Sequence, residues 1–118
     1  MIFNLENRTT PECHASTIAE TRRGLIAAWF GGLREKDPSV GIWLSHHVDG
    51  VWQTPLEVAN GNQPDGTRLA CWNPVLFQPS QGPLLLFYKQ GATIADWQTL
   101  MMTSQDGGYR DRKSTRLN

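Results

Sequence analysis

The chain repeats itself at a fixed distance, and this repeat constrains the fold more than any other feature of the sequence. Cys13 recurs as Cys71, and Gly24 recurs as Gly82, each after 58 positions. An apolar run follows each glycine, LIAAWF in the first copy and PLLLFY in the second. Further on, VGIWLS in the first copy corresponds to TLMMTS in the second. Self-similarity at a period of this size predicts that one supersecondary unit is built twice.

The second copy ends in a turn motif of the Asp-box type, Ser-x-Asp-x-Gly, formed by Ser104-Gln105-Asp106-Gly107-Gly108. In such a turn the carboxylate accepts hydrogen bonds from backbone amides, and glycine supplies the positive φ that the turn needs. The first copy holds a degenerate version, in which Asp49 and then Trp52 follow Ser45. We expect Asp49 and Asp106 to be structural rather than catalytic.

Each copy is predicted to contain three antiparallel strands and a fourth, which lies at 52–59 in the first copy. Four-stranded antiparallel repeats of this length are typical of β-propeller blades. The second strand of each copy is apolar on both faces, as expected for a strand that lies between neighbouring blades. The alternative is an open meander or a small sandwich with two similar halves.

The last eight residues, DRKSTRLN at 111–118, match the translation of a common sequencing-adapter read, and we exclude them from the fold prediction. We therefore interpret 1–110 as part of a longer β-propeller chain. Blade one is expected at about 11–60 and blade two at about 67–110. The fourth strand of blade two, and the aromatic residue that would complete the Asp box at position 111, are expected to be missing. Such an open pair of blades should be marginally stable and inactive alone.

Composition and charge exclude several classes of function. The formal net charge is zero and no basic stripe appears, which argues against a nucleic-acid partner. No stretch is apolar for long enough to cross a membrane. The first residues lack the pattern of a signal peptide, so we expect a cytoplasmic protein if Met1 is the true start. Neither a metal nor a cofactor is expected, because His46 and His47 are adjacent on a strand and point to opposite faces.

Several segments together resemble the sialidase (neuraminidase) superfamily with Asp-box, or BNR, repeats, and most closely its bacterial and plant sialidase-like branch. These segments are CHASTIAET, GLIAAWFGG, EKDPSVGIWLS, CWNPVLF, GPLLLFYK and TSQDGG. The resemblance implies a six-bladed propeller of which this chain holds about two blades. It also implies an exo-acting glycoside hydrolase whose partners are a glycan substrate and the missing blades of its own chain.

Strand direction predicts which residues share a site. Consecutive strands are antiparallel, so the loop before the first strand and the loop between the second and third emerge at one end of the blades. His14 and the loop 31–38 lie at this end, together with Trp72-Asn73 and the loop 89–96. Both Asp-box turns lie at the opposite end.

The resemblance implies a general acid on the loop between the second and third strands of blade one, and its position corresponds to Asp37. Glu35 is the rival on the same loop, because its surroundings fit the motif of the branch better. The alternative for both is a solvated loop, since Arg34, Glu35, Lys36 and Asp37 alternate in charge. Sialidases bind the sugar carboxylate with three arginines. The resemblance places the first of them at His14 and the second at Gly32, and Arg34 is two residues from Gly32. An imidazole cannot copy the bidentate contact of a guanidinium with a carboxylate, so sialic acid itself is in doubt as the substrate.

Three further residues are candidates for substrate binding. Trp72 and Asn73 open blade two, where an aromatic ring and an amide suit a sugar, although Trp72 also suits the core. Lys89 follows an apolar strand at the same end and suits an anionic sugar group, with a solvated surface lysine as the alternative. Cys13 and Cys71 occupy equivalent blade positions, and we expect two buried free thiols rather than a disulfide.

Three hypotheses follow for the function. The first is a sialidase-like exo-glycosidase that uses a loop carboxylate as general acid and a tyrosine nucleophile from the missing blades. The second is a related propeller enzyme that acts on another sugar. The third is a non-catalytic propeller that binds glycans.

Overall fold

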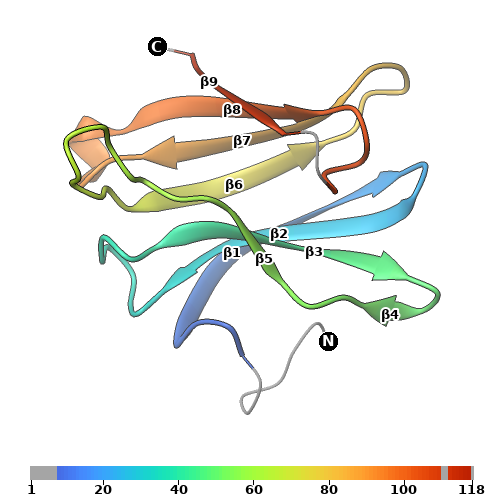
Figure 1. Ribbon diagram of the computed structural model, residues 1–118, viewed down its shortest axis with the longest axis horizontal. Coiled ribbons are helices and arrows are strands. Elements are labelled where there is room, and N and C mark those ends of the chain that lie inside the picture. Colours follow the sequence, from blue (N-terminus) through green and yellow to red (C-terminus); the bar gives the residue numbers. More distant parts are fainter. Residues whose placement is uncertain (1–7, 110–111, 118) are drawn as a thin grey trace.

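Two antiparallel β-sheets, seen in Figure 1, form the chain in the computed structural model, which describes residues 8–109 and 112–117. In the first sheet β2 lies between β1 and β3, and two short strands, β4 and β5, pair along β3. Its strands are β1 (Glu12–Thr21), β2 (Gly24–Gly32), β3 (Gly41–Val48), β4 (Val51–Trp52) and β5 (Leu56–Ala59).

The second sheet has four strands in chain order, each antiparallel to the next. A short 3-10 helix, η1 (Ile94–Asp96), lies in the loop between its second and third strands. The strands are β6 (Cys71–Phe77), β7 (Leu84–Gln90), β8 (Gln98–Ser104) and β9 (Lys113–Arg116). The fold is therefore all-β, as predicted. Among the described residues, no helix is long and apolar enough to cross a membrane.

The 58-residue repeat is also present in the backbone geometry. Strand pairing shifts register between His14 and Thr17 in β1, and between Trp72 and Val75 in β6. Each irregularity holds one residue with positive φ, Ala15 at 56° and its counterpart Asn73 at 47°. The glycines that open β2 and precede β7 match as well, with φ of 110° at Gly24 and 112° at Gly82. The repeat therefore extends to the bulge in the first strand of each sheet, and the two sheets are copies of one unit.

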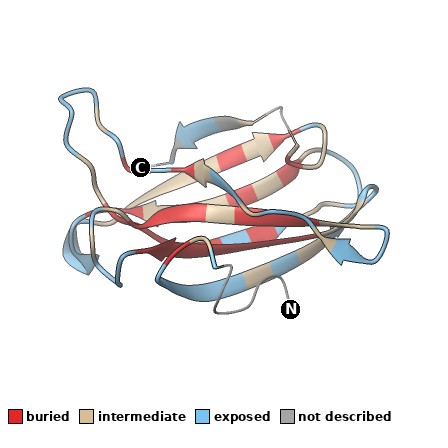
Figure 2. Ribbon diagram, turned by 60° about the horizontal axis from the view of Figure 1, so that its bottom comes forward, coloured by how far each residue is buried: buried red, intermediate tan, exposed pale blue. Residues whose placement is uncertain are grey.

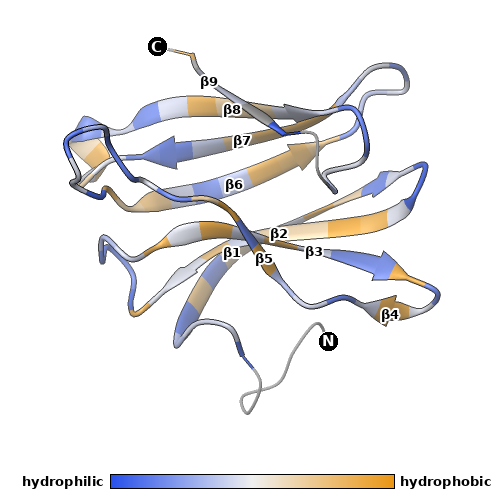
Figure 3. Cartoon of the chain, viewed as in Figure 1, coloured by the Kyte–Doolittle hydropathy of each residue, from blue (hydrophilic) through white to orange (hydrophobic). Residues whose placement is uncertain are grey.

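The two sheets pack against each other around one apolar core, and β6 is the strand of the second sheet that lies next to the first (Figure 1). The Leu76 amide at this junction donates to the Thr17 hydroxyl oxygen, 3.2 Å away. Figure 3 shows apolar residues running along β2. Core side chains from both sheets include Ile26, Ala28, Phe30, Ile42, Leu44, Trp72, Leu76, Leu84, Leu86 and Tyr88.

Strand β2 is buried on both faces from Ile26 to its end, which confirms the prediction for the first copy (Figure 2). In β7 only alternate residues are buried. The buried face of β7 packs on the first sheet, whereas Leu85, Phe87 and Lys89 on its other face are half-buried. No described part of the chain packs as a further sheet on that side of β7.

The fourth strand departs from its prediction in both copies. In the first sheet it is broken into β4 and β5, and Pro55 lies in the gap. Proline lacks the amide hydrogen that a strand ladder needs, so pairing with β3 stops and then resumes. In the second sheet the expected absence of this strand is wrong, because β9 pairs along β8. Backbone hydrogen bonds, which every residue but proline can donate, supply this pairing. The predicted break at position 111 lies outside the described residues.

Candidate functional site

The predicted site residues of blade one lie around the loop 33–40, which joins β2 to β3. A carboxylate oxygen of Asp37 accepts the Ser39 amide at 2.8 Å, and the Asp37 amide donates to the Arg34 carbonyl at 3.1 Å. The Ser39 hydroxyl oxygen accepts the Leu33 amide at 3.0 Å. These bonds close the loop on itself, so its charged side chains are presented from a fixed backbone.

The ionisation of Asp37 follows from the same contacts. Hydrogen bonds from the Ser39 amide and hydroxyl, with a smaller contribution from Arg34, hold the pKa of Asp37 below its ordinary value. The Arg34 Nε atom lies 3.9 Å from the carboxylate. A general acid needs a pKa near the working pH, so this carboxylate is poorly suited to donate a proton. Its geometry fits a residue that shapes the loop and orients Arg34.

Glu35 is exposed on the loop, and its backbone is hydrogen-bonded to β1. The Glu35 amide donates to Oε1 of Glu12 at 3.4 Å. The same Oε1 atom lies 3.5 Å from Nε2 of His14, and both of these side chains are about half-exposed. The His14 ring also packs against Phe30, with 5.5 Å between ring centroids. Glu12 therefore brings His14 and the loop together.

Two residues that the sequence prediction missed organise this end of the blade. Glu12 is two residues before His14, a spacing that puts both on one face of a strand. This spacing could have identified Glu12 as a neighbour of His14 from the sequence alone. Arg68, from the segment between the sheets, donates from Nη2 to the Ser39 carbonyl at 2.8 Å and lies 3.3 Å from a Glu57 carboxylate oxygen. No local pattern announces this contact, because Arg68 is 29 residues away from Ser39.

The start of β6 lies beside the loop, since the Cys71 amide donates to the Val40 carbonyl at 3.0 Å. Trp72 is 4% exposed and donates from Nε1 to the Gly91 carbonyl at 2.9 Å. Its ring lies between Phe30 and Trp97, at centroid distances of 6.1 and 5.2 Å. This arrangement favours the alternative that Trp72 is a core residue packed between the blades, rather than a residue that binds sugar.

The other two candidates of blade two are exposed or turned away. Asn73 is exposed at the bulge that its positive φ creates. Lys89 donates from Nζ to the Thr99 hydroxyl at 2.6 Å. It shares the face of β7 that points away from the first sheet, so it does not converge with His14 and the loop.

The two cysteines are free. Cys71 is buried as expected, whereas Cys13 is exposed, so the prediction of two buried thiols is wrong for Cys13. Burial raises the pKa of Cys71 to about 12. No group of three or more His, Cys, Asp or Glu side chains is arranged to hold a metal ion within the described ranges.

The turns at the opposite end of the strands include the Asp box. The Ser104 hydroxyl donates to the Asp106 carboxylate at 2.8 Å and accepts the Gly108 amide at 2.7 Å. The carboxylate also accepts the Tyr109 amide at 3.1 Å. The corresponding turn of the first sheet is a two-residue hairpin, with φ of 51° at Asp49 and 81° at the following glycine. Asp49 follows Ser45 by four positions, whereas Asp106 follows Ser104 by two, so this turn lacks the Ser-x-Asp spacing of the Asp box.

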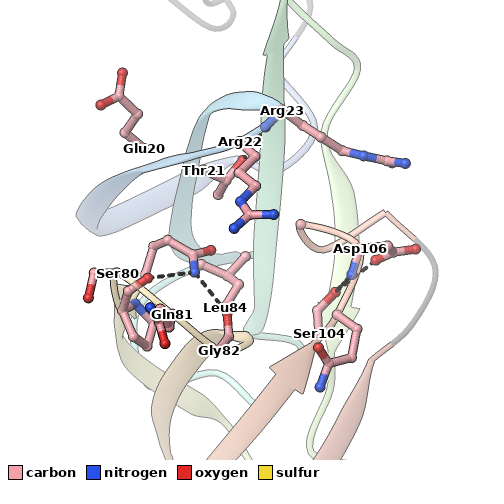
Figure 4. A pocket seen from close by; sticks show the side chains of 14 residues that line it. Glu20, Thr21, Arg22, Arg23, Ser80, Gln81, Gly82, Leu84, Ser104 and Asp106 are labelled. Carbon is pink, nitrogen blue, oxygen red and sulfur yellow. Dashed lines mark hydrogen bonds between the residues drawn. The ribbon is translucent and has the colours of Figure 1, made fainter.

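This opposite end also holds an open cleft of about 720 Å³, shown in Figure 4. Three turns line it: β1–β2, β6–β7 and the Asp box. None of the predicted site residues lines this cleft, so the cleft and the predicted site are at different ends of the blades.

Two antiparallel sheets that repeat one strand arrangement, the second of them carrying an Asp-box turn, define the blades of an Asp-box β-propeller. The family comparison agrees, since residues 23–118 match the model for the BNR repeat-like domain. The chain belongs to this family. A comparison with curated proteins gives no significant match.

Proposed function

We propose that this chain forms two blades of a sialidase-like exo-acting glycoside hydrolase, which removes terminal sugars from glycans. The observation that carries the proposal is the fixed loop 33–40, which presents Glu35 and Asp37 beside the Glu12–His14 pair at one end of the blades. A general acid must be able to reach the glycosidic oxygen of a bound substrate, and the loop presents the exposed Glu35 where a substrate could approach it. Membership of the BNR repeat-like family supports the proposal.

We assign the general-acid role to Glu35 and a positioning role to Asp37. The hydrogen bonds from Ser39 keep the pKa of Asp37 low, so it stays ionised at neutral pH. In this assignment Asp37 fixes the loop and attracts Arg34, while the exposed Glu35 donates the proton. The nucleophile, which is a tyrosine in sialidases, and the remaining substrate-binding groups would come from further blades.

The substrate favoured by the site is a sugar other than sialic acid. His14 replaces an arginine that would bind a carboxylate, and Glu12 lies 3.5 Å from its ring. A carboxylate in that position repels an anionic sugar and accepts hydrogen bonds from hydroxyl groups. A non-catalytic glycan-binding propeller is the competing function, and it needs neither carboxylate of the loop.

The test compares Glu35→Gln and Asp37→Asn in the full-length gene product, assayed on a panel of aryl glycosides that includes sialosides and neutral sugars. Loss of the general acid should lower turnover by about 10² to 10⁴. Activated phenolic leaving groups need less protonation, so the loss at Glu35 should shrink with a better leaving group. Asp37→Asn should show no such dependence.

Glu20→Gln is a matched control, because Glu20 is exposed and lies at the opposite end of the strands. It should leave turnover unchanged. Wild-type turnover that neither loop substitution reduces would refute the acid assignment. Glycan binding without hydrolysis of any panel member would favour the binding propeller instead.

A further inference from the structure

The cleft at the Asp-box end is lined by three turns, and each turn is held in its conformation by hydrogen bonds of its own side chains. In the β1–β2 turn, the Thr21 hydroxyl donates to the Gly24 carbonyl at 3.0 Å and accepts the Arg23 amide at 3.1 Å. In the β6–β7 turn, Gln78 Nε2 donates to the carbonyls of Pro79 and Gly82 at 3.0 and 3.1 Å. The hydrogen bonds of Ser104 and Asp106 hold the third turn, the Asp box. A ligand would therefore meet a preformed surface.

One cation is directed into this preformed cleft. Figure 4 shows the Arg22 guanidinium pointing between the β6–β7 turn and the Asp box. Arg22 is exposed, and within the described part of the chain its side chain has neither an ion-pair partner nor a hydrogen-bond partner. The neighbouring Arg23 makes a cation–π contact instead, since its guanidinium lies 4.9 Å above the Tyr109 ring.

Two acidic residues, Glu20 and Asp106, also line the cleft, and among the described residues neither forms an ion pair with Arg22. In Figure 4 the Glu20 carboxylate is directed away from the Arg22 guanidinium. The Asp106 carboxylate is engaged by the Ser104 hydroxyl and the Tyr109 amide. Opposite Arg22, the exposed residues Ser80 and Gln81 add a hydroxyl and an amide to the lining.

We propose that this cleft is a binding site for an acidic saccharide, with Arg22 holding its carboxylate or sulfate group. A guanidinium binds such planar or multidentate oxyanions through parallel hydrogen bonds. The hydroxyl of Ser80 and the amide of Gln81 supply the donors and acceptors that sugar hydroxyl groups need. The volume of about 720 Å³ lies within the usual range for small-ligand sites. The site lies at the opposite strand ends from Glu35 and is independent of the proposed hydrolase function.

The experiment is a titration of the 118-residue chain followed by ¹⁵N–¹H correlation spectra, which also report whether each variant is folded. The probes are sialyllactose, lactose as its neutral match, and inorganic sulfate. Saturable shifts at the amides of Gly82, Gly107 and Gly108 with sialyllactose, and not with lactose, are expected. Arg22→Ala should weaken this binding by about tenfold, as expected for loss of a charge-assisted bond.

Arg8→Ala is the discriminating control, because Arg8 is exposed, does not line the cleft and has no part in the proposed hydrolase site. It should leave the sialyllactose affinity unchanged. Loss of binding in this variant and not in Arg22→Ala would overturn the proposal, as would lactose binding as tightly as sialyllactose. Sulfate binding as tightly as sialyllactose would show a small-anion site and overturn the saccharide assignment. An absence of saturable shifts with every probe would overturn the site altogether.

Discussion

The Nε2 atom of His46, on β3 of the first sheet, lies 2.9 Å from the carbonyl oxygen of Gly107 in the Asp-box turn of the second. The His46 ring also stacks on Tyr109, with centroids 3.8 Å apart and planes 17° from parallel. Arg23 covers Tyr109 at 4.9 Å. The Asp box thus does more than close one hairpin, because it docks the second blade onto the first.

This contact should make stability depend on pH near neutrality. Burial, with nearby Arg112 and Arg23, holds the pKa of His46 below its ordinary value of 6.5, despite the opposing Gly107 carbonyl. The unfolded chain therefore binds the proton more readily, and stability falls as pH drops below 6.5 until the folded-state pKa is passed. Urea unfolding at pH 8 and at successive values down to pH 5 measures the effect.

His46→Gln is the matched variant, because its amide can still donate to Gly107 but does not titrate. It should lose part of the pH dependence between pH 8 and 5. The lowered pKa values of Asp37 and Asp65 act below about 3.8, outside this window. An identical slope in wild type and variant would contradict the role given to His46.

The hydrogen bonds of the Asp box predict a clear cost for their removal. Asp106→Ala removes the acceptor of the Ser104 hydroxyl and of the Tyr109 amide. We expect a loss of about 1–3 kcal/mol in the free energy of unfolding, since the amide is left without its partner. Urea denaturation measures this loss. The exposed Ser80→Ala is the control and should change stability by less than about 0.5 kcal/mol. Equal effects would refute a structural role for Asp106.

The repeat made the two sheets predictable, because strand pairing follows local sequence, whereas the paired bulges at Ala15 and Asn73 were not predicted. Contacts between distant residues were not predictable in this way. The aromatic residue of the Asp box illustrates this point, since Tyr109 comes five positions after Ser104 instead of seven and stacks on a ring from the other blade. Its partner His46 is defined only by how the blades pack.

The candidate site was predictable in part for the same reason. Strand direction brought His14 and the loop 33–40 to one end. The exposure of Glu35, the low pKa of Asp37 and the burial of Trp72 depend on hydrogen bonds that a pattern does not specify. Glu12 was missed although its spacing from His14 is regular, because an exposed glutamate on a strand is usually only solvated.

The two thiols should differ sharply in reactivity. Cys13 is exposed, whereas Cys71 is buried and has a pKa raised to about 12. The thiolate is the nucleophile, so only Cys13 should react with a maleimide at pH 7 in the folded chain. Mass spectrometry should find one modification, at Cys13, and two after denaturation in urea. Modification of both at equal rates in the native chain would show that the core around Cys71 opens readily.

The outer face of the second sheet predicts self-association of the isolated chain. Val75 and Phe77 are 53% and 55% exposed, and their strand pairing places them beside Phe87 and Leu85 on one face. Exposed apolar faces of this kind associate because burial removes them from water. Sedimentation velocity should therefore show an average mass that rises with concentration.

Replacing Val75 and Phe77 together with lysine should abolish this association without unfolding the sheet, because both side chains point away from the core. Ile94→Lys is the control, since Ile94 is 68% exposed but lies in η1, outside the sheet face. It should leave association unchanged. A wild-type chain that stays monomeric at all concentrations and unfolds in one cooperative transition would show that two blades suffice as a stable unit. The marginal stability expected of an open blade pair would then be wrong.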